Sequence, residues 1–128
     1  MRKNKFGAIA CSDDHGNMFD SMGERDRYAD LKLRERGKLI SKLILKPKKV
    51  ILIPKSGTKP EIAWQLDYSY VDEEAGLFCF EDYKPRPMAR YEHLLIRLWR
   101  HYGPAPLRIS GRKGTRFTLL KTIQGGSL

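Results

Sequence analysis

Cysteine and long apolar runs are scarce in this sequence. Its 128 residues include only Cys11 and Cys79 as cysteines, too few for a disulfide framework, and we expect both to be reduced thiols. The longest uninterrupted aliphatic run is Val50–Ile53, whereas a bilayer-spanning helix needs about 20 apolar residues. Met1-Arg2-Lys3 is not followed by a signal-peptide core. We therefore expect a cytoplasmic protein with no membrane partner.

Two common ligand motifs are also missing. Cys11 and His15 supply too few ligands for a zinc site, which takes four. Ser56-Gly57-Thr58-Lys59 lacks the spaced glycines of a phosphate-binding P-loop. The sequence therefore predicts neither a structural zinc site nor a nucleotide-driven motor.

Acidic residues are outnumbered by basic ones. Lysine and arginine total 25 against 15 aspartates and glutamates, which gives a formal charge of +10. Such an excess commonly serves a polyanionic partner, and nucleic acid is the leading candidate. A ribosomal or membrane-surface protein would be equally basic, so the motifs must decide between these classes.

Length and composition predict a single folded domain. The chain is 41% hydrophobic, and its 128 residues suit one core, since domains usually run about 100 to 150 residues. We expect an N-terminal arm or loose hairpin over residues 1–18, one domain over 19–124, and a short tail over 125–128.

A first helix is predicted over residues 22–36. Ser21 and Glu24 have the spacing of a capping box, and Phe19 precedes them as a possible hydrophobic staple. Gly37 is suited to end the helix.

Aliphatic residues then predict strands. Residues 39–46 and 48–53 form one long bent strand or two short ones, since Pro47 separates them, and residues 54–60 form a turn. Residues 64–71 and 77–84 predict a β-hairpin.

The register of this hairpin decides where its acidic residues lie. If Asp72 opposes Leu77, then Asp67 lies directly opposite Asp82 on the same face of the sheet. A slip of one residue would send the two carboxylates to opposite faces. The expected register brings them together.

A second helix is predicted from Met88 to Tyr102, between Pro87 and Gly103-Pro104. Its expected packing face consists of Tyr91, Leu94, Leu95, Leu98 and Tyr102. Its basic face consists of Arg90, His93, Arg97 and Arg100. Two final strands, residues 107–110 and 115–123, complete an α/β fold with a central mixed β-sheet flanked by helices, in the order αβββαβ.

The hairpin carries a pattern suited to phosphodiester chemistry. Asp82 and Lys84 are two residues apart on one strand, so they share a face, and Asp67 would join them. Carboxylates are the ligands that Mg²⁺ or Mn²⁺ prefers, and such an ion can activate water. A lysine amine beside that water can stabilise developing negative charge.

These residues also carry a family resemblance over roughly residues 5–100. It rests on the following segments: Lys5-Phe6-Gly7-Ala8, Phe19-Asp20-Ser21, Glu24, Tyr28, Pro47, Lys48, Asp67 and Glu81-Asp82-Tyr83-Lys84. The pattern resembles the PD-(D/E)XK nuclease superfamily, and more closely a family of small phage-encoded nuclease-like proteins of unassigned function. The order of acids is also similar to that of phage Holliday-junction resolvases of the endonuclease I type.

The resemblance implies a restriction-endonuclease-like core and a metal-dependent endodeoxyribonuclease, located in the host cytoplasm if the chain is phage-encoded. It implies Asp67, Asp82 and the Tyr83 carbonyl as ligands of Mg²⁺ or Mn²⁺, and Lys84 beside the attacking water. Glu24 would be a further ligand or would orient the water. A resolvase-like version implies branched DNA and a homodimer. Pro85 replaces the glycine that often follows the lysine, and Gln65-Leu66 replaces the proline of the superfamily signature.

Each site residue also has an ordinary structural role open to it. Glu24 is a capping residue, Asp67 suits a solvent-facing strand position, and Asp82 with Lys84 makes a same-face salt bridge. Glu81 should face away from Asp82 and is not expected to bind metal. The basic residues expected to contact phosphates, or alternatively to form only a solvated surface, are Arg86, Arg90, His93, Arg97, Arg100, Arg112, Lys113 and Arg116.

Two rival functions remain open at this point. A catalytically silent nuclease scaffold would bind nucleic acid as an accessory factor in replication or packaging. An RNA-binding protein of ribosomal type would explain the charge but would leave the acids of the hairpin unexplained.

Overall fold

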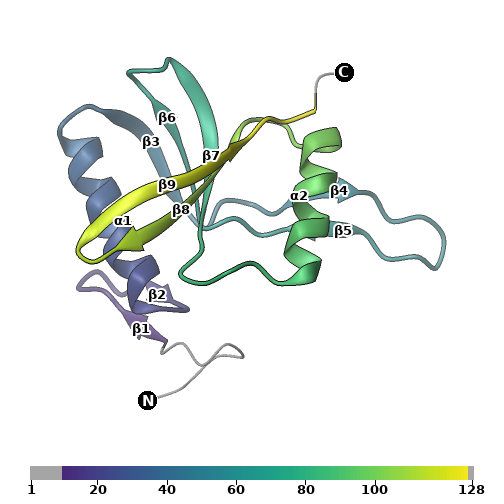
Figure 1. Ribbon diagram of the computed structural model, residues 1–128, viewed down its shortest axis with the longest axis horizontal. Coiled ribbons are helices and arrows are strands. Elements are labelled where there is room, and N and C mark those ends of the chain that lie inside the picture. Colours follow the sequence, from purple (N-terminus) through teal and green to yellow (C-terminus); the bar gives the residue numbers. More distant parts are fainter. Residues whose placement is uncertain (1–9, 127–128) are drawn as a thin grey trace.

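The computed structural model describes residues 10–126, which form an α/β fold (Figure 1). The elements in chain order are β1 Cys11–Ser12, β2 Met18–Phe19, α1 Met22–Arg36, β3 Ile40–Leu45, β4 Val50–Ile53, β5 Ile62–Trp64, β6 Tyr68–Asp72, β7 Leu77–Tyr83, α2 Arg90–Tyr102, β8 Leu107–Lys113 and β9 Arg116–Ile123.

A mixed five-stranded sheet with the order β3-β6-β7-β8-β9 forms the centre. Neighbouring strands are antiparallel except β7 and β8, which are parallel because α2 lies between them in the chain. The predicted α/β class and central mixed sheet are confirmed. The strands β1 and β2 form one additional small sheet, and β4 and β5 form another.

The two helices lie against different sets of buried side chains. The cluster with Leu31 of α1 includes Tyr68, Tyr70 and Cys79 from the central sheet. A second cluster contains Ile96 and Trp99 of α2. Phe80 of β7 and Leu107 and Ile109 of β8 belong to the same cluster. Because successive strand residues point to opposite faces, Glu81 and Asp82 face different helices.

The first helix and the hairpin register agree with the sequence prediction. The Ser21 hydroxyl accepts a hydrogen bond from the Glu24 N–H at 3.1 Å, and Gly37 caps the other end of α1. In the β6–β7 hairpin, Asp72 pairs with Leu77 as expected.

The structure decides one strand alternative that the sequence left open, and it shows that two other predicted strand boundaries were wrong. Residues 39–53 form two strands that belong to different sheets, which settles the alternative left open by Pro47. The strand expected from Trp64 to Val71 is divided, since Trp64 belongs to β5 and β6 begins at Tyr68. The Trp64 ring is buried edge-on against the Trp99 ring, with the two ring centroids 6.0 Å apart. β8 runs on to Lys113, so the turn before β9 lies at Gly114-Thr115.

The expected packing face of α2 was wrong in part. The helix begins at Arg90 rather than Met88, and Tyr91, Leu94 and Tyr102 are exposed. The buried residues are Glu92, Ile96 and Trp99, with Leu95 and Leu98 partly covered. The large indole of Trp99 sets the orientation of the helix, and its N–H donates to the Ala105 carbonyl at 2.9 Å.

The chain ends agree in part with the predicted arm and tail. β1 and β2 form the expected hairpin before α1, whereas Lys5-Phe6-Gly7-Ala8 lies outside the described residues. Gly126 donates its N–H to the Gly103 carbonyl at 3.0 Å, so the described part of the tail contacts the end of α2. Cys11 and Cys79 are free thiols. Neither helix within residues 10–126 is long and apolar enough to cross a membrane.

Candidate active site

Asp67 and Asp82 meet where the β6–β7 hairpin enters the body of the protein. The Asp72–Leu77 register places Tyr68 opposite Glu81, and Asp67 is the next residue outward. The Tyr83 N–H donates to the Asp67 carboxylate at 2.7 Å, which fixes that side chain beside the end of β7. Asp82 is buried, with 3% of its surface exposed. The predicted convergence of Asp67 and Asp82 is therefore observed.

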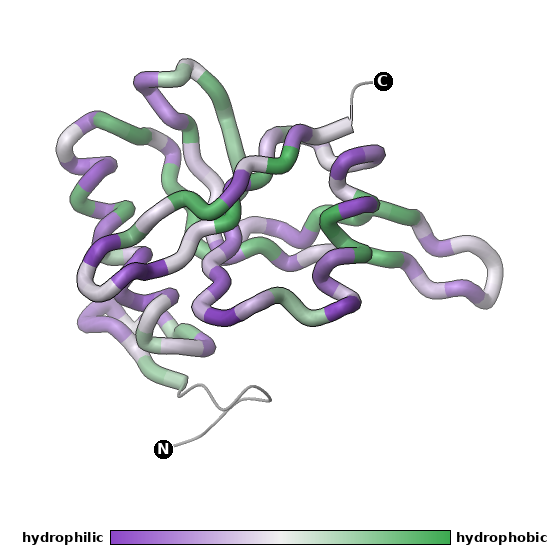
Figure 2. The backbone as a smooth tube through the Cα atoms, in the orientation of Figure 1, coloured by the Kyte–Doolittle hydropathy of each residue, from purple (hydrophilic) through white to green (hydrophobic). Residues whose placement is uncertain are grey.

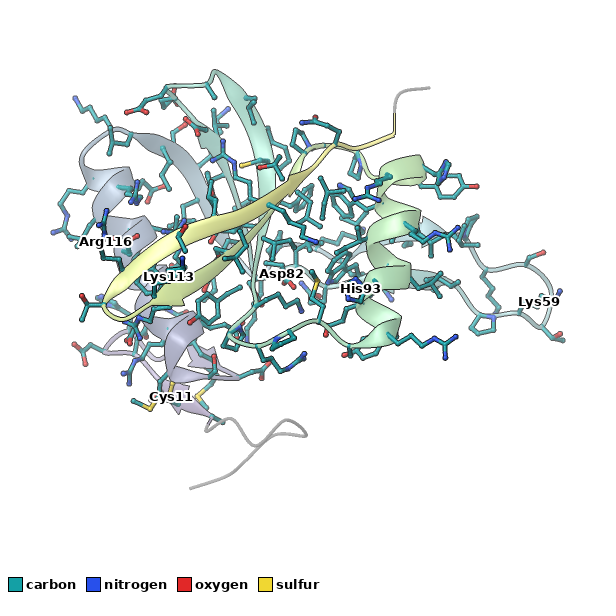
Figure 3. The ribbon with its side chains drawn as sticks, in the orientation of Figure 1. Cys11, Lys59, Asp82, His93, Lys113 and Arg116 are labelled. Carbon is teal, nitrogen blue, oxygen red and sulfur yellow. The ribbon has the colours of Figure 1, made fainter. Side chains whose placement is uncertain are left out.

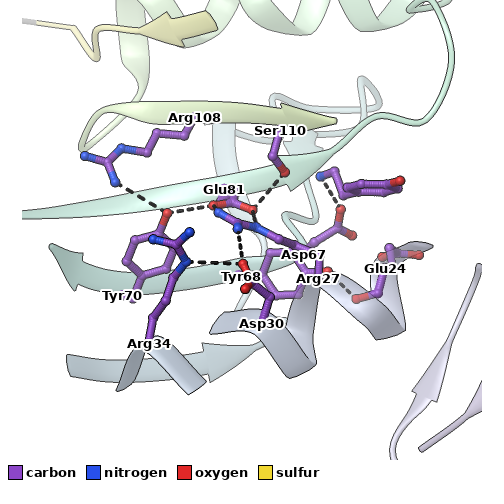
Figure 4. Close-up of polar contacts among 11 residues, drawn as sticks. Glu24, Arg27, Asp30, Arg34, Asp67, Tyr68, Tyr70, Glu81, Arg108 and Ser110 are labelled. Carbon is purple, nitrogen blue, oxygen red and sulfur yellow. Dashed lines mark hydrogen bonds and ion pairs between the residues drawn. The ribbon is translucent and has the colours of Figure 1, made fainter. Parts of the chain in front are cut away.

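Glu24 reaches the same position from the first turn of α1. The Tyr68 hydroxyl donates to the Glu24 carbonyl oxygen at 2.6 Å, which ties the helix to the sheet (Figure 4). The Glu24 carboxyl lies close enough to the carboxyl of Asp67 to raise the pKa of Asp67. The capping bond from Ser21 uses the backbone N–H of Glu24 and leaves its carboxyl for this contact. The structural role and the predicted site role of Glu24 are therefore compatible.

The electrostatics of the acids follow from burial and crowding. Burial, the charge of Asp82 and a hydrogen bond with Glu24 raise the pKa of Asp67 well above its usual value. Burial also raises the pKa of Asp82, although the neighbouring Lys84 ammonium opposes that shift. Burial and these neighbours therefore favour the protonated form of the Asp67 carboxyl. Such a crowded group favours any cation that replaces the proton.

Lys84 completes the group from the end of β7. Its Nζ lies 2.8 Å from an Asp82 carboxylate oxygen and also contacts Glu92 of α2. Burial lowers the pKa of Lys84, but the two carboxylates outweigh it and raise that pKa above its usual value. Lys84 is therefore a cation at neutral pH, held beside Asp82.

Glu92 is the site residue that sequence reasoning missed. It is buried, contacts Lys84, lies 3.0 Å from Arg86 and accepts the Ala89 N–H at 2.8 Å. Burial alone would raise the pKa of Glu92, but these partners lower it to about 2. The available signal was a glutamate at the third helical position, where a carboxylate accepts the N–H at the start of the helix. The mistaken packing face of α2 concealed it.

The carboxyl groups of Asp67, Asp82 and Glu24 are of the chemical type that binds a hard divalent cation. Within residues 10–126, no three His, Cys, Asp or Glu side chains are arranged as a metal-binding group. Glu24 and Asp82 nonetheless both raise the pKa of Asp67, so the three carboxyl groups lie near one another. Oxygen ligands of this kind are those of Mg²⁺ and Mn²⁺. The residues that would hold such an ion are Asp67, Asp82 and Glu24.

Glu81 faces away from these acids, as predicted. Its carboxylate accepts two bonds from Arg27, at 2.7 and 2.9 Å, one from the Tyr70 hydroxyl at 2.6 Å and one from the Ser110 hydroxyl at 2.8 Å (Figure 4). These bonds satisfy the carboxylate inside the α1 face of the sheet. Glu81 therefore has a structural role.

The predicted basic residues fall into separate groups. Arg90, His93, Arg97 and Arg100 are exposed on α2, whereas Lys113 and Arg116 lie at the β8–β9 turn on the α1 side (Figure 3). Two of the eight have acidic partners: Arg86 pairs with Glu92, and Arg112 lies 3.2 Å from Asp26.

A hollow in the described part of the chain lies away from the acid and lysine group. It has a volume of about 460 Å³ and is formed by the β1–β2 turn and the outer side of α1, with residues such as His15, Tyr28 and Lys32 in its wall. The hollow is not lined by any residue of the candidate site, namely Glu24, Asp67, Asp82, Lys84 and Glu92. The candidate site is therefore assigned from its chemistry.

Comparisons with known proteins do not identify the chain. No protein-family model matches it, and no curated protein matches it either.

Proposed function

We propose that this protein is a metal-dependent endonuclease that hydrolyses DNA phosphodiester bonds. The observation that carries the proposal is the convergence of carboxyl groups from three elements, Glu24 of α1, Asp67 before β6 and Asp82 of β7, beside the Lys84 ammonium. Burial and the two neighbouring carboxyl groups raise the pKa of Asp67, which makes the arrangement costly without a cation. A functional requirement would explain that cost.

Each residue has a role in this proposal. Mg²⁺ or Mn²⁺ bound by Asp67, Asp82 and Glu24 would neutralise the phosphate and lower the pKa of water. The Tyr83 carbonyl is a further candidate ligand, as the family resemblance implies. Lys84, held as a cation by Asp82 and Glu92, would stabilise negative charge on the phosphate oxygens. The exposed arginines of α2 would contact the DNA backbone.

The element order supports the restriction-endonuclease-like version of the fold. Without the β4–β5 hairpin, the order from α1 to β8 is αβββαβ, and β9 adds one strand at the edge of the sheet. We extend the proposal to a branched-DNA substrate and a homodimer, by analogy with the phage resolvases that the sequence resembles.

The test is cleavage of labelled linear duplex, single-stranded, flap and four-way-junction DNA with Mg²⁺, Mn²⁺ or EDTA. We expect metal-dependent cleavage that falls at least about 100-fold in Asp82→Asn, with DNA binding retained. Glu73→Gln is a matched control, because Glu73 is an exposed acid in the loop of the same hairpin. Cleavage that Asp82→Asn leaves unchanged would remove the site assignment.

A second candidate function is supported by the state of Lys84. Asp82 and Glu92 both engage its ammonium, so the lysine is already neutralised by two carboxylates. A scaffold of this kind could bind nucleic acid without cutting it, as an accessory factor in replication or packaging. Calorimetric titration with Mn²⁺ separates the two functions, since a pure binder has no need to hold a metal among the acids. Binding of DNA with neither metal uptake nor cleavage would favour this candidate.

A further inference from the structure

The β4–β5 hairpin extends beyond α2 from a firmly packed base. It belongs to neither the central sheet nor the β1–β2 sheet, and Figure 1 shows its connecting loop reaching past the helix. Leu52 and Trp64 at its base are buried in the core that contains Ile96 and Trp99. The base is therefore fixed to the body of the protein, and the direction of the hairpin is set by that packing.

The far end of the hairpin is exposed and positively charged. All residues from 54 to 60 are exposed, and the colouring of Figure 2 changes along the hairpin from hydrophobic strands to a more polar end. Lys55 and Lys59 lie in this loop, and Figure 3 shows Lys59 at its outer end. Within the described part of the chain, neither lysine makes an ion pair. Both charges are available to a partner.

The turn at this end is well defined. Ser56 and Lys59 exchange two backbone hydrogen bonds, at 3.0 and 2.9 Å, and Gly57 supplies the positive φ of +57° that the turn needs. An ordered turn loses little conformational entropy on binding. The lysines are therefore presented by a preorganised ribbon.

Charge is concentrated in this part of the sequence. Residues 46–62 contain five lysines and one glutamate. The glutamate, Glu61, lies 2.7 Å from the Lys49 Nζ, and Lys46 donates to the Met18 carbonyl at 2.8 Å. Within residues 10–126, the lysines of this segment whose side chains have no such partner are Lys48, Lys55 and Lys59. The adjacent helix α2 adds the exposed Arg97 and Arg100.

We infer that the β4–β5 hairpin is a second nucleic-acid contact, a lysine-tipped ribbon that binds the backbone of duplex DNA beside the acidic site. A two-stranded β-ribbon fits the major groove of B-form DNA, and lysines at its end bind phosphates without reading sequence. This inference rests on the proposed function in one respect, namely that the partner is nucleic acid. It adds an element that the acidic residues do not supply.

The same features disfavour another copy of this chain as the occupant. Ile51 and Ile62 are 48% and 40% exposed, which alone would suit a dimer contact. Two hairpins brought together, however, would place like charges close to one another, and desolvating lysines without carboxylate partners is unfavourable. A polyanion relieves that repulsion.

The experiment measures binding of labelled duplex DNA, and of one of its strands alone, at several salt concentrations in EDTA, where metal-dependent cleavage cannot occur. The variant is Lys55→Gln with Lys59→Gln, and the matched control is Arg36→Gln with Lys38→Gln at the end of α1. All four positions are exposed, and each double variant lowers the formal charge from +10 to +8. Circular dichroism checks that each variant folds.

We expect the hairpin variant to bind duplex about tenfold more weakly and to lower the salt slope of log Kd by about 2, one for each phosphate that the variant no longer binds. The control should change affinity less than about twofold. The inference is overturned if the two variants behave alike, or if binding of single-stranded DNA is weakened as strongly as binding of duplex.

Failure of this inference can be told from failure of the proposed function. Wild-type protein that binds and cuts DNA while the hairpin variant is unaltered removes the hairpin contact alone. Wild-type protein that binds no nucleic acid removes both.

Discussion

Lys84 and Glu92 form an ion pair that joins the end of β7 to the first turn of α2. Only 14% of the Lys84 side chain and 3% of the Glu92 side chain are exposed. The segment between them contains Pro85 and Pro87, which restrict its backbone. The Lys84–Glu92 ion pair holds the two ends of this segment together. Glu92 in turn holds Lys84 near Asp82. Pro85, a departure from the family pattern, is therefore compatible with a lysine held in place.

Glu92→Gln should remove an acid-sensitive part of the stability. The pKa of Glu92 is lowered to about 2 in the folded protein, so its stabilisation is present above its unfolded pKa of about 4.5 and is lost as pH falls toward 2. We expect the variant to be about 2 to 3 kcal/mol less stable at pH 6.

Urea unfolding of wild type and variant at pH 6, 4 and 3 measures the difference. It should shrink steadily as the pH falls. A difference that is the same at all three values would show that the Glu92 charge does not stabilise the fold.

Asp67→Asn should increase stability at neutral pH. The pKa of Asp67 is raised, so the stability associated with its protonated form is complete below an unfolded pKa of about 3.9 and is lost as pH rises through the folded value. Asparagine cannot ionise and can still accept the Tyr83 N–H through its side-chain oxygen. In EDTA at pH 8 we expect a gain of about 1 to 2 kcal/mol, which disappears near pH 4.

The same pair of proteins tests the metal. Added Mg²⁺ should raise the Tm of wild type and have a smaller effect on Asp67→Asn, because a ligand that binds only the folded state stabilises it. Asp14→Asn, at an exposed position in the β1–β2 turn, is the control. Loss of stability in Asp67→Asn throughout the pH range would contradict the crowded-acid description.

Local sequence patterns predicted the parts of the fold that local interactions determine. The capping of α1 depends on Ser21 and Gly37, and the hairpin register depends on the short loop from Asp72 to Gly76. Since the register follows from that loop, the meeting of Asp67 and Asp82 was predictable as well.

Long-range packing decided the parts that were mispredicted. Trp64 and Trp99 are 35 residues apart in sequence, so no local pattern shows that their rings meet and that β5 separates from β6. On α2, Tyr91, Leu94 and Tyr102 have helical spacing, yet they are exposed, and the buried side chains are those that reach Leu52 and the central sheet. That mistake left Glu92 out of the candidate site and hid its contact with Lys84.

Gly23→Ala should disturb the candidate active site, although Gly23 is not one of the site residues. A Cβ at this position would lie 2.6 Å from the Tyr83 ring, so the ring or the helix must move. Alanine favours a helix over glycine by about 1 kcal/mol, but we expect a net loss of about 1 to 3 kcal/mol from the overpacking. Tyr83 lies between Asp82 and Lys84 in the chain, so cleavage should fall too.

The matched control is Gly37→Ala at the other end of α1. There the nearest atom to a new Cβ is the Leu33 carbonyl oxygen at 3.5 Å, an ordinary contact. Urea unfolding should show a change of less than about 1 kcal/mol. Equal effects of the two substitutions would mean that Tyr83 does not restrict the approach of α1.

Glu81 and Asp82 should respond oppositely to loss of their charges, although they are neighbours in β7. Glu81→Gln removes the buried carboxylate that pairs with Arg27 and leaves that guanidinium with the half-buried Asp30, so we expect a loss of about 3 kcal/mol. Asp82→Asn relieves repulsion with Asp67 while Glu92 still pairs with Lys84, so stability should change by about 1 kcal/mol or less.

Activity should show the reverse pattern. At a temperature where both variants are folded, Glu81→Gln should keep cleavage within about threefold of wild type, whereas Asp82→Asn should lose at least about 100-fold. Urea unfolding and cleavage assays on the same preparations provide both readouts. A folded Glu81→Gln protein without activity would move the chemistry to the α1 face of the sheet. The alternation of a β-strand thus separates an acid that stabilises the fold from one that we assign to the reaction.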